Sequence, residues 1–136
     1  MEFQQYLISA YECESPLDDA DFLKDTLVSS VQIVKAHIVD SLTHKYVSHG
    51  LTVVLLLAES HVMVSTWPEY RYAYVDIFLC NRAMPPRLVW LEIERLLRPK
   101  ETKIHEINHN MIGREAGESE HVLEMVTNNL SRELEA

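Results

Sequence analysis

A serine beside a histidine, Ser60-His61, directly follows Glu59 at the end of an apolar segment. A serine hydroxyl becomes a nucleophile when a base takes its proton, and histidine is the usual base. Adjacent residues of a strand point to opposite faces, so we do not expect Ser60 and His61 to form such a pair within a strand. These residues alone leave open a structural turn and a catalytic serine, and they favour the turn.

A second group, His105-Glu106-Ile107-Asn108-His109, has the H-E-x-x-H spacing of zinc proteases. That chemistry requires a helix, because one helical turn brings both histidines to one zinc ion. The segment begins shortly after Pro99, lacks a helical apolar stripe, and has Ile112 where a longer zinc motif has glycine. We therefore expect a surface strand and no metal site.

The spacing of apolar residues predicts the elements that position these groups. Spacings of three and four predict a helix over 19–34 and another that begins at Pro85-Pro86 and ends at Pro99. A third helix is predicted by four apolar residues that recur every four positions, Val122, Val126, Leu130 and Leu134. Strands are predicted over 3–12, 36–47, 51–58, 61–66, 70–80 and 102–112. This order is typical of an α/β (α+β) fold, a two-layer sandwich of a mostly antiparallel sheet with helices on one face.

The composition excludes several classes of function. The chain has 136 residues, 47% of them hydrophobic, and a formal charge of −9 that argues against nucleic acid as a partner. None of the three glycines belongs to a nucleotide-binding loop. Cys13 and Cys80 are too few for a thiolate zinc site and are expected to be reduced. Without a signal-peptide pattern or a membrane-spanning apolar run, we expect a cytoplasmic protein with no membrane partner.

Two segments, LAESH from Leu57 to His61 and TWPEY from Thr66 to Tyr70, resemble the core signature of the prokaryotic S-adenosylmethionine decarboxylase proenzymes. Further matches are His44-Lys45-Tyr46, Gly50 and the run from Val75 to Cys80. The resemblance covers roughly residues 4–112 without gaps. It implies a domain over 1–112, which leaves 113–136 as an acidic helical C-terminal extension.

The resemblance implies a self-processing, pyruvoyl-dependent decarboxylase of polyamine biosynthesis. Such a chain is cut between a glutamate and a serine, here Glu59 and Ser60. The serine hydroxyl attacks the preceding carbonyl, and elimination from the resulting ester leaves a pyruvoyl group, here from Ser60, as a built-in cofactor. Its ketone binds the substrate amine as a Schiff base and accepts electrons as carbon dioxide leaves.

The resemblance also implies roles for single residues. Cys80 matches the proton donor of the decarboxylation, whereas without the family it would be interpreted as a buried core thiol. Tyr46 would stack on the adenine and Glu69 would accept hydrogen bonds from the ribose hydroxyls. Trp67 would also contribute to the substrate site.

Three family positions differ in this chain. A histidine credited with proton transfer during self-processing, and with packing against the adenine, is Ser65 here. Serine is a poor general base because its hydroxyl does not titrate near neutral pH. At a position where the family has serine, this chain has Thr52, which keeps a hydroxyl. Arg71 places a charge beside Glu69.

These departures leave three hypotheses open. The chain decarboxylates S-adenosylmethionine, or it keeps the pyruvoyl chemistry and acts on arginine or ornithine, or it is an unprocessed, non-enzymatic homologue that binds a ligand or a partner subunit. The resemblance further implies a homodimer with the two sheets facing each other, a four-layer αββα arrangement, and residues of both protomers near each site. A sheet with helices on one face alone also needs cover on the other face.

Overall fold

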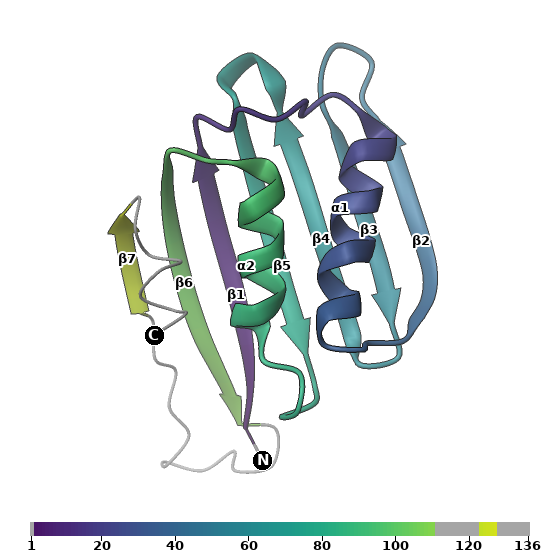
Figure 1. The fold of residues 1–136 in the computed structure, drawn as a ribbon, viewed down its shortest axis with the longest axis vertical. Coiled ribbons are helices and arrows are strands. Elements are labelled where there is room, and N and C mark those ends of the chain that lie inside the picture. Colours follow the sequence, from purple (N-terminus) through teal and green to yellow (C-terminus); the bar gives the residue numbers. More distant parts are fainter. Residues whose placement is uncertain (1, 111–122, 128–136) are drawn as a thin grey trace.

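The computed structural model describes residues 2–110 and, for residues 123–127, the backbone alone. The strands are β1 (Glu2–Tyr11), β2 (Ile38–Lys45), β3 (Leu51–Leu57), β4 (Ser60–Trp67), β5 (Tyr72–Leu79), β6 (Glu101–Asn110) and β7 (Leu123–Thr127). Within the described ranges they form one sheet in the order β2-β3-β4-β5-β1-β6-β7 (Figure 1). Each neighbouring pair in that order is antiparallel.

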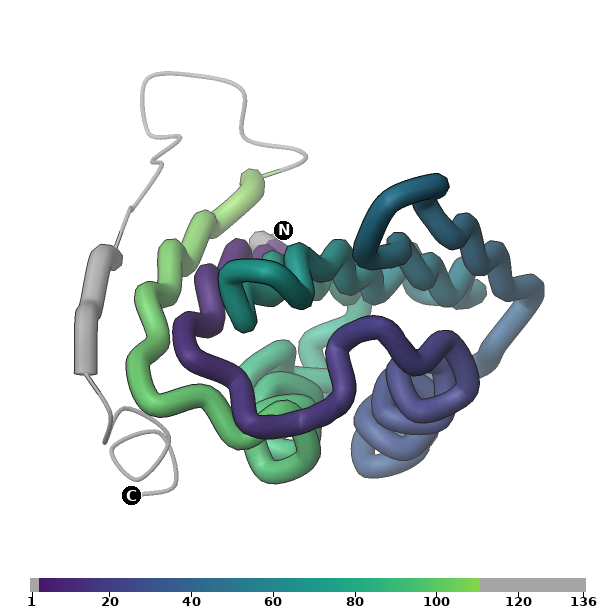
Figure 2. The backbone as a smooth tube through the Cα atoms, turned by 90° about the horizontal axis from the view of Figure 1, so that it is seen from above, coloured from purple at the N-terminus to yellow at the C-terminus, as the bar shows by residue number. Residues whose placement is uncertain are grey.

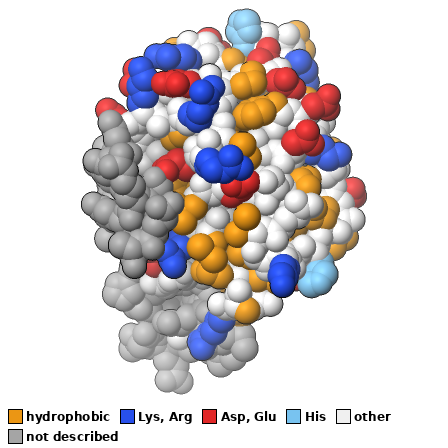
Figure 3. Space-filling view, viewed as in Figure 1, with side chains coloured by type: hydrophobic (Ala, Val, Ile, Leu, Met, Phe, Trp, Pro, Cys, Tyr) orange, Lys and Arg blue, Asp and Glu red, His pale blue; other side chains and the backbone are white. Residues whose placement is uncertain are grey.

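Two helices, α1 (Ala20–Ile33) and α2 (Pro86–Leu97), lie side by side on one face of the sheet and form a second layer (Figure 2). Asp19 caps α1, because its carboxylate accepts a hydrogen bond from the backbone N–H of Phe22 at 3.0 Å. Pro86 opens α2 in the first turn, where proline is tolerated. Charged side chains of both signs are scattered over the outer side of this layer, among hydrophobic and other side chains (Figure 3). The fold class predicted from the sequence is confirmed.

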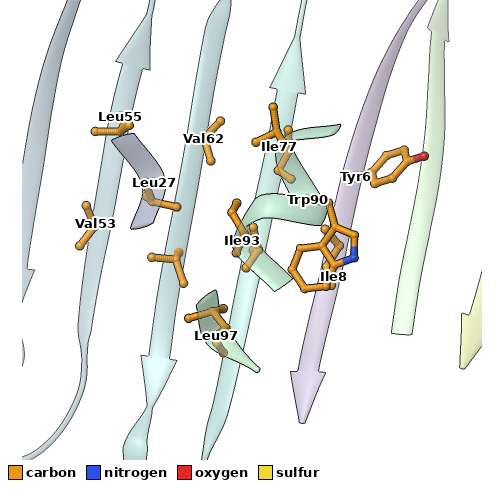
Figure 4. Packing of buried hydrophobic residues seen from close by; sticks show 14 of the residues in the cluster. Tyr6, Ile8, Leu27, Val53, Leu55, Val62, Ile77, Trp90, Ile93 and Leu97 are labelled. Atoms are coloured by element: carbon orange, nitrogen blue, oxygen red, sulfur yellow. The ribbon is translucent and has the colours of Figure 1, made fainter. Parts of the chain in front are cut away.

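The core lies between the helices and the sheet face that they cover (Figure 4). Every second residue of the central strands points into it, as the predicted alternation requires. Fully buried residues that meet there are Ile8, Leu27, Val53, Leu55, Val62, Ile77, Trp90, Ile93 and Leu97. Full burial of one such side chain stabilises a fold by about 1.5–3 kcal/mol, so this layer fixes the strands in their register. No helix in the described ranges is long and apolar enough to cross a membrane.

The opposite face of the sheet, which we term the open face, is covered by none of the described elements (Figure 2). The alternate residues of the strands point to this side. On β4 and β5 they are half-buried and include His61, Met63, Ser65, Tyr74, Asp76 and Phe78. Because packing under the helices fixes the strand register, it also determines which polar side chains lie together on the open face.

Gly50 forms the turn between β2 and β3. Its φ is +84°, and a Cβ there would overlap the carbonyl oxygen of Thr66, so only glycine fits. The N–H of Gly50 donates to the carboxylate of Asp18 at 3.0 Å, and its carbonyl accepts from the N–H of Tyr46, also at 3.0 Å. This turn holds Tyr46 at one end of the sheet.

The third helix predicted over 122–134 is wrong at residues 123–127, which form β7. Apolar residues four apart share one face of a helix, but residues four apart also share one face of a strand. β6 would otherwise present a row of unpaired backbone groups at the sheet edge, and β7 pairs with them in antiparallel register. The rest of the predicted helix lies outside the described residues, and the boundary at residue 112 stays a prediction.

Candidate active site

Ala58 and Glu59 connect β3 to Ser60, the first residue of β4, and we term these three residues the β3–β4 turn. Hydrogen bonds hold this turn in place. The N–H of Ala58 donates to the carbonyl of His37 at 2.8 Å. The carboxylate of Glu59 accepts from the backbone N–H of His37 at 3.0 Å and lies 2.7 Å from its ring Nδ1. These bonds from His37 lower the pKa of Glu59. The carbonyl oxygen of Glu59 accepts from the N–H of Cys80 at 2.8 Å, so the carbonyl of the Glu59–Ser60 peptide is already polarised.

Ser60 has a φ of +135°, a conformation that glycine adopts readily and other residues rarely. Such a backbone conformation costs about 1–3 kcal/mol and persists only where the surroundings impose it. Here the bonds from His37 and Cys80 on either side of the turn supply that constraint. The Glu59–Ser60 peptide bond is therefore followed directly by the strained backbone of Ser60.

Ser60 and His61 do form a pair, contrary to the prediction from strand alternation. The hydroxyl oxygen Oγ of Ser60 lies 3.2 Å from Nδ1 of His61. The prediction failed because alternation requires extended backbone at both residues, and the positive φ of Ser60 breaks that condition. The far nitrogen of the ring, Nε2, lies 3.1 Å from Oδ2 of Asp76 on the neighbouring strand β5. Nothing in the sequence near Ser60 indicated this third group.

Three residues with hydroxyls, Tyr46, Thr52 and Ser65, meet at the other end of the open face, and we term them the hydroxyl cluster. The Oγ atoms of Thr52 and Ser65 are 2.7 Å apart, and Oη of Tyr46 lies 3.0 Å from Thr52 Oγ1. Thr52 and Ser65 face each other directly across β3 and β4. Ser65 is five positions along the strand from Ser60, a distance of about 16 Å. The structure brings the members of the cluster together but does not bring them to Ser60 within one chain.

The remaining predicted substrate residues lie at the same end as the hydroxyl cluster. Trp67 packs against Tyr72 with ring centroids 5.4 Å apart, and with Tyr11 and Tyr70 they line a shallow hollow of about 410 Å³. Glu69 lies exposed in η1 (Pro68–Tyr70), a short helical turn. Arg71, which follows it, pairs with Glu12 at 3.5 Å.

Comparisons with known proteins identify the family of this chain. The family model described as S-adenosylmethionine decarboxylase matches residues 4–110. The chain belongs to the S-adenosylmethionine decarboxylase family. A Methanococcus maripaludis S-adenosylmethionine decarboxylase proenzyme is 36% identical over 107 residues, which are 78% of this chain and 88% of that protein. A proenzyme of the same name from Prochlorococcus marinus is 39% identical over 92 residues, 66% of this chain and 75% of that protein.

The fold of a solved family member agrees as well. The crystal structure of the adenosylmethionine decarboxylase from Aquifex aeolicus superposes with a TM-score of 0.71 at 25% identity, covering 85% of this chain and 96% of that one. The family predicted from the sequence is therefore confirmed, and with it the class of enzyme, a decarboxylase made as a proenzyme. The individual site residues stay predictions.

The two cysteines of this S-adenosylmethionine decarboxylase homologue lie in opposite environments. Cys80 is exposed and immediately follows β5, next to the turn that contains Ser60. Cys13 is the buried thiol, and burial raises its pKa to about 12. The interpretation of Cys80 as a core thiol is wrong, because Cys80 continues the series of alternate residues of β5 that point to the open face, whereas the residues between them enter the core. A solvent-accessible thiol can exchange protons with a substrate, whereas the thiol of Cys13 stays protonated.

The H-E-x-x-H segment lies in β6, and the predicted surface strand is confirmed. Its two histidines, His105 and His109, share one face but stand about 13 Å apart, because four residues of strand separate them. His109 instead stacks on Phe78 with ring centroids 4.9 Å apart, and its Nε2 lies 2.9 Å from Oε1 of Gln5. The spacing rules out one ion bound by both histidines.

The β3–β4 turn fits the pyruvoyl group that family proenzymes form. It presents a serine next to a polarised carbonyl, a strained backbone and an accessible thiol. Each of these features belongs to the chain itself, so no separate binding loop for a cofactor is needed.

Proposed function

We infer that this chain cuts itself between Glu59 and Ser60, forms a pyruvoyl group from Ser60, and then decarboxylates S-adenosylmethionine. The observation that carries the proposal is the hydrogen bond from the N–H of Cys80 to the carbonyl of Glu59, beside the positive φ of Ser60. Family membership supports the same reaction. A polarised carbonyl beside a strained serine is the arrangement that an acyl shift from nitrogen to oxygen requires.

The cleavage needs only groups of the chain and one water molecule. Oγ of Ser60 attacks the carbonyl carbon of Glu59, and the N–H of Cys80 stabilises the negative charge on the carbonyl oxygen. The bond to the nitrogen of Ser60 breaks, which leaves an ester and a free amine. Loss of the proton on Cα of Ser60 then expels the carboxylate of Glu59, and water replaces the nitrogen, which leaves as ammonia.

The second reaction uses the thiol of Cys80. Once formed, the pyruvoyl group supplies a ketone that binds the substrate's amine and draws electrons from the bond to the leaving carbon dioxide. The exposed thiol of Cys80 stands beside the same turn and donates a proton to the carbon from which carbon dioxide has left. Cys80 thus contributes its backbone to the first reaction and its side chain to the second.

The separation of Ser60 from the hydroxyl cluster supports a homodimer. A second copy, packed face to face with its strands reversed, brings the cluster of one protomer opposite the β3–β4 turn of the other. The open face carries exposed apolar side chains that such packing buries, among them Leu42, Leu56 and Trp67. Each site then takes Ser60 and Cys80 from one protomer and Tyr46, Thr52, Ser65, Trp67 and Glu69 from the other, in an αββα arrangement.

The serine at position 65 makes a cationic amino acid a second candidate substrate. The hydroxyl cluster offers one aromatic ring, that of Tyr46, and Ser65 adds a hydroxyl where a second ring would sandwich an adenine. A cationic amino acid such as arginine or ornithine has no base to stack. Trp67 and Tyr46, both exposed, favour the nucleoside substrate because they offer flat apolar surfaces.

A carbon dioxide release assay tests the proposed function. The purified protein is incubated separately with carboxyl-labelled S-adenosylmethionine, arginine and ornithine. We expect release from S-adenosylmethionine alone. Release from arginine or ornithine instead would select the second candidate, and no release from any of the three would contradict an enzymatic function and favour the binding homologue.

A further inference from the structure

The cleavage described above needs a base, because the hydroxyl of Ser60 is a weak nucleophile until its proton is removed. Within the chain, Ser65 is about 16 Å away and offers only another hydroxyl. The ring of His61 touches the reacting atom itself, at 3.2 Å. We propose that His61, oriented by Asp76, is the base that removes the proton from Ser60 Oγ during self-cleavage. This inference rests on the proposed cut between Glu59 and Ser60.

The contacts of the ring decide which nitrogen carries the proton. An ionised carboxylate only accepts hydrogen bonds, so Nε2 of His61, 3.1 Å from Asp76, must carry the hydrogen and donate it. In a neutral imidazole the other nitrogen is then an acceptor. Nδ1, the atom beside Ser60 Oγ, therefore has a free electron pair directed at the hydroxyl that must lose its proton.

Asp76 is itself held in place. Its other oxygen, Oδ1, accepts a hydrogen bond from Nε2 of Gln5 at 2.9 Å, and the amide oxygen of Gln5 lies 2.9 Å from Nε2 of His109. The ring of Phe78 lies between the two histidines, edge-on to His61 and stacked on His109. The side chains of His61 and Asp76 are 32% and 19% exposed, so the pair is partly shielded from water. This network keeps the ring of His61 in one orientation.

The proton transfers balance without any further reactant. Nδ1 of His61 takes the proton as the bond from Oγ to the carbonyl carbon of Glu59 forms. The same proton passes from the imidazolium to the nitrogen of Ser60 as the bond between that nitrogen and the carbonyl carbon breaks. The products are an ester and an amine, and His61 returns to its neutral form.

The first experiment compares uncut and cut protein by intact mass over time after purification. We expect His61→Ala and His61→Gln to cut at least about 100-fold more slowly than the wild type, the usual contribution of a general base. The matched control is His105→Ala, a histidine on the same face but on β6, which should cut normally. Added imidazole should partly restore cutting in His61→Ala, which a variant that had lost its fold would not show.

Hydroxylamine shows at which step His61 acts, because it cleaves esters and leaves peptide bonds intact. We expect the uncut His61→Ala protein to resist hydroxylamine, since the ester has not formed. A hydroxylamine-sensitive His61→Ala protein would contradict the role of His61 in ester formation, and so would cutting at the wild-type rate. An uncut wild-type protein would instead contradict the proposed function itself.

A second experiment tests Asp76 as a positioning residue. In Asp76→Asn, the amide oxygen faces the donor Gln5 and the NH₂ group faces Nε2 of His61, which moves the ring hydrogen to Nδ1. We expect cutting to slow by at least about 10-fold. The ¹⁵N shifts of the His61 ring, measured in the uncut Ser60→Ala background, should change from the Nε2–H to the Nδ1–H form. An unchanged ring tautomer, or unchanged cutting, would overturn the proposed orientation.

Discussion

At one end of the open face, the groups around Glu59 and Ser60 include two imidazoles, two carboxylates and a thiol, and hydrogen bonds hold the turn from both sides. At the other end, the hydroxyl cluster of Tyr46, Thr52 and Ser65 is neutral and lies beside exposed aromatic rings. The first end can move protons and polarise a carbonyl, whereas the second end can bind a ligand and orient it. A distance of about 16 Å separates them in one chain. We therefore propose that the reaction takes place at the first end and that the second end recognises the substrate.

The largest expected effect separates the two uses of Cys80. Cys80→Ser keeps the backbone N–H that binds the carbonyl of Glu59 but replaces the thiol with a hydroxyl, a far weaker acid. We expect cutting to stay complete and the kcat for carbon dioxide release to fall by about 100-fold. Loss of cutting in this variant, or an unchanged kcat, would show that the two roles are not divided in this way.

The next effect tests whether the two ends meet across a dimer. Thr52→Val removes the central hydroxyl of the hydroxyl cluster, and we expect cutting to slow by about 10-fold. The control is Thr43→Val, on the opposite side of the neighbouring strand β2.

Co-expression of Thr52→Val with Ser60→Ala then distinguishes one chain from two. In a mixed dimer the Ser60 of one chain faces the intact Thr52 of the other, so about half of the Thr52→Val chains should cut at the normal rate. If co-expression restores nothing, both ends act within one chain or the dimer does not form.

A smaller effect is expected at Ser65. Ser65→His adds an imidazole to the hydroxyl cluster, where a dimer would bring it close to the Ser60 of the other protomer. Because His61 already acts as a base, we expect cutting to accelerate only by about 2- to 10-fold. An unchanged rate, measured by intact mass, would remove the concern that serine at this position limits processing.

The smallest expected effect is a pH dependence of the protein's stability that arises from Glu59 in the β3–β4 turn. Hydrogen bonds from His37 lower the pKa of Glu59, so its carboxylate stabilises the fold above its unfolded pKa of about 4.3. That contribution is lost as the pH falls through the folded value. In the uncut Ser60→Ala background, Glu59→Gln should reduce stability at pH 7 by less than about 1 kcal/mol, and the difference should shrink below about pH 4. A thermal-unfolding difference independent of pH would contradict this contact.

The sequence predicted the two helices and the first six strands, and in the helices and the central strands it did so because their apolar residues repeat with clear periods. The strands predicted over 61–66 and 70–80 also contain His61 and Asp76. The sequence could not show that they meet, because that depends on the register between β4 and β5, which pairs His61 with Phe78 and leaves Asp76 on the diagonal. The contact of Ser60 with His61 was missed for a different reason, since the positive φ of Ser60 arises from tertiary contacts of the turn.

The residues that match the family could be identified from their motifs in the sequence. The distances between these residues could not. Thr52 and Ser65 are thirteen positions apart in sequence and in contact in space, while Ser60 and Ser65 are five apart and at opposite ends of β4. A hairpin turn brings the first pair together, and an extended strand keeps the second pair apart. Motif spacing alone therefore did not show that these residues form two groups about 16 Å apart in one chain.

Intact-mass analysis of the purified wild-type protein tests the central claim most directly. We expect two fragments that separate after Glu59, the larger one blocked at its N-terminus, with one water gained and one ammonia lost in total. Ser60→Ala should remain uncut and folded. A single 136-residue species that stays uncut on incubation, or fragments that have gained water without losing ammonia, would contradict the account.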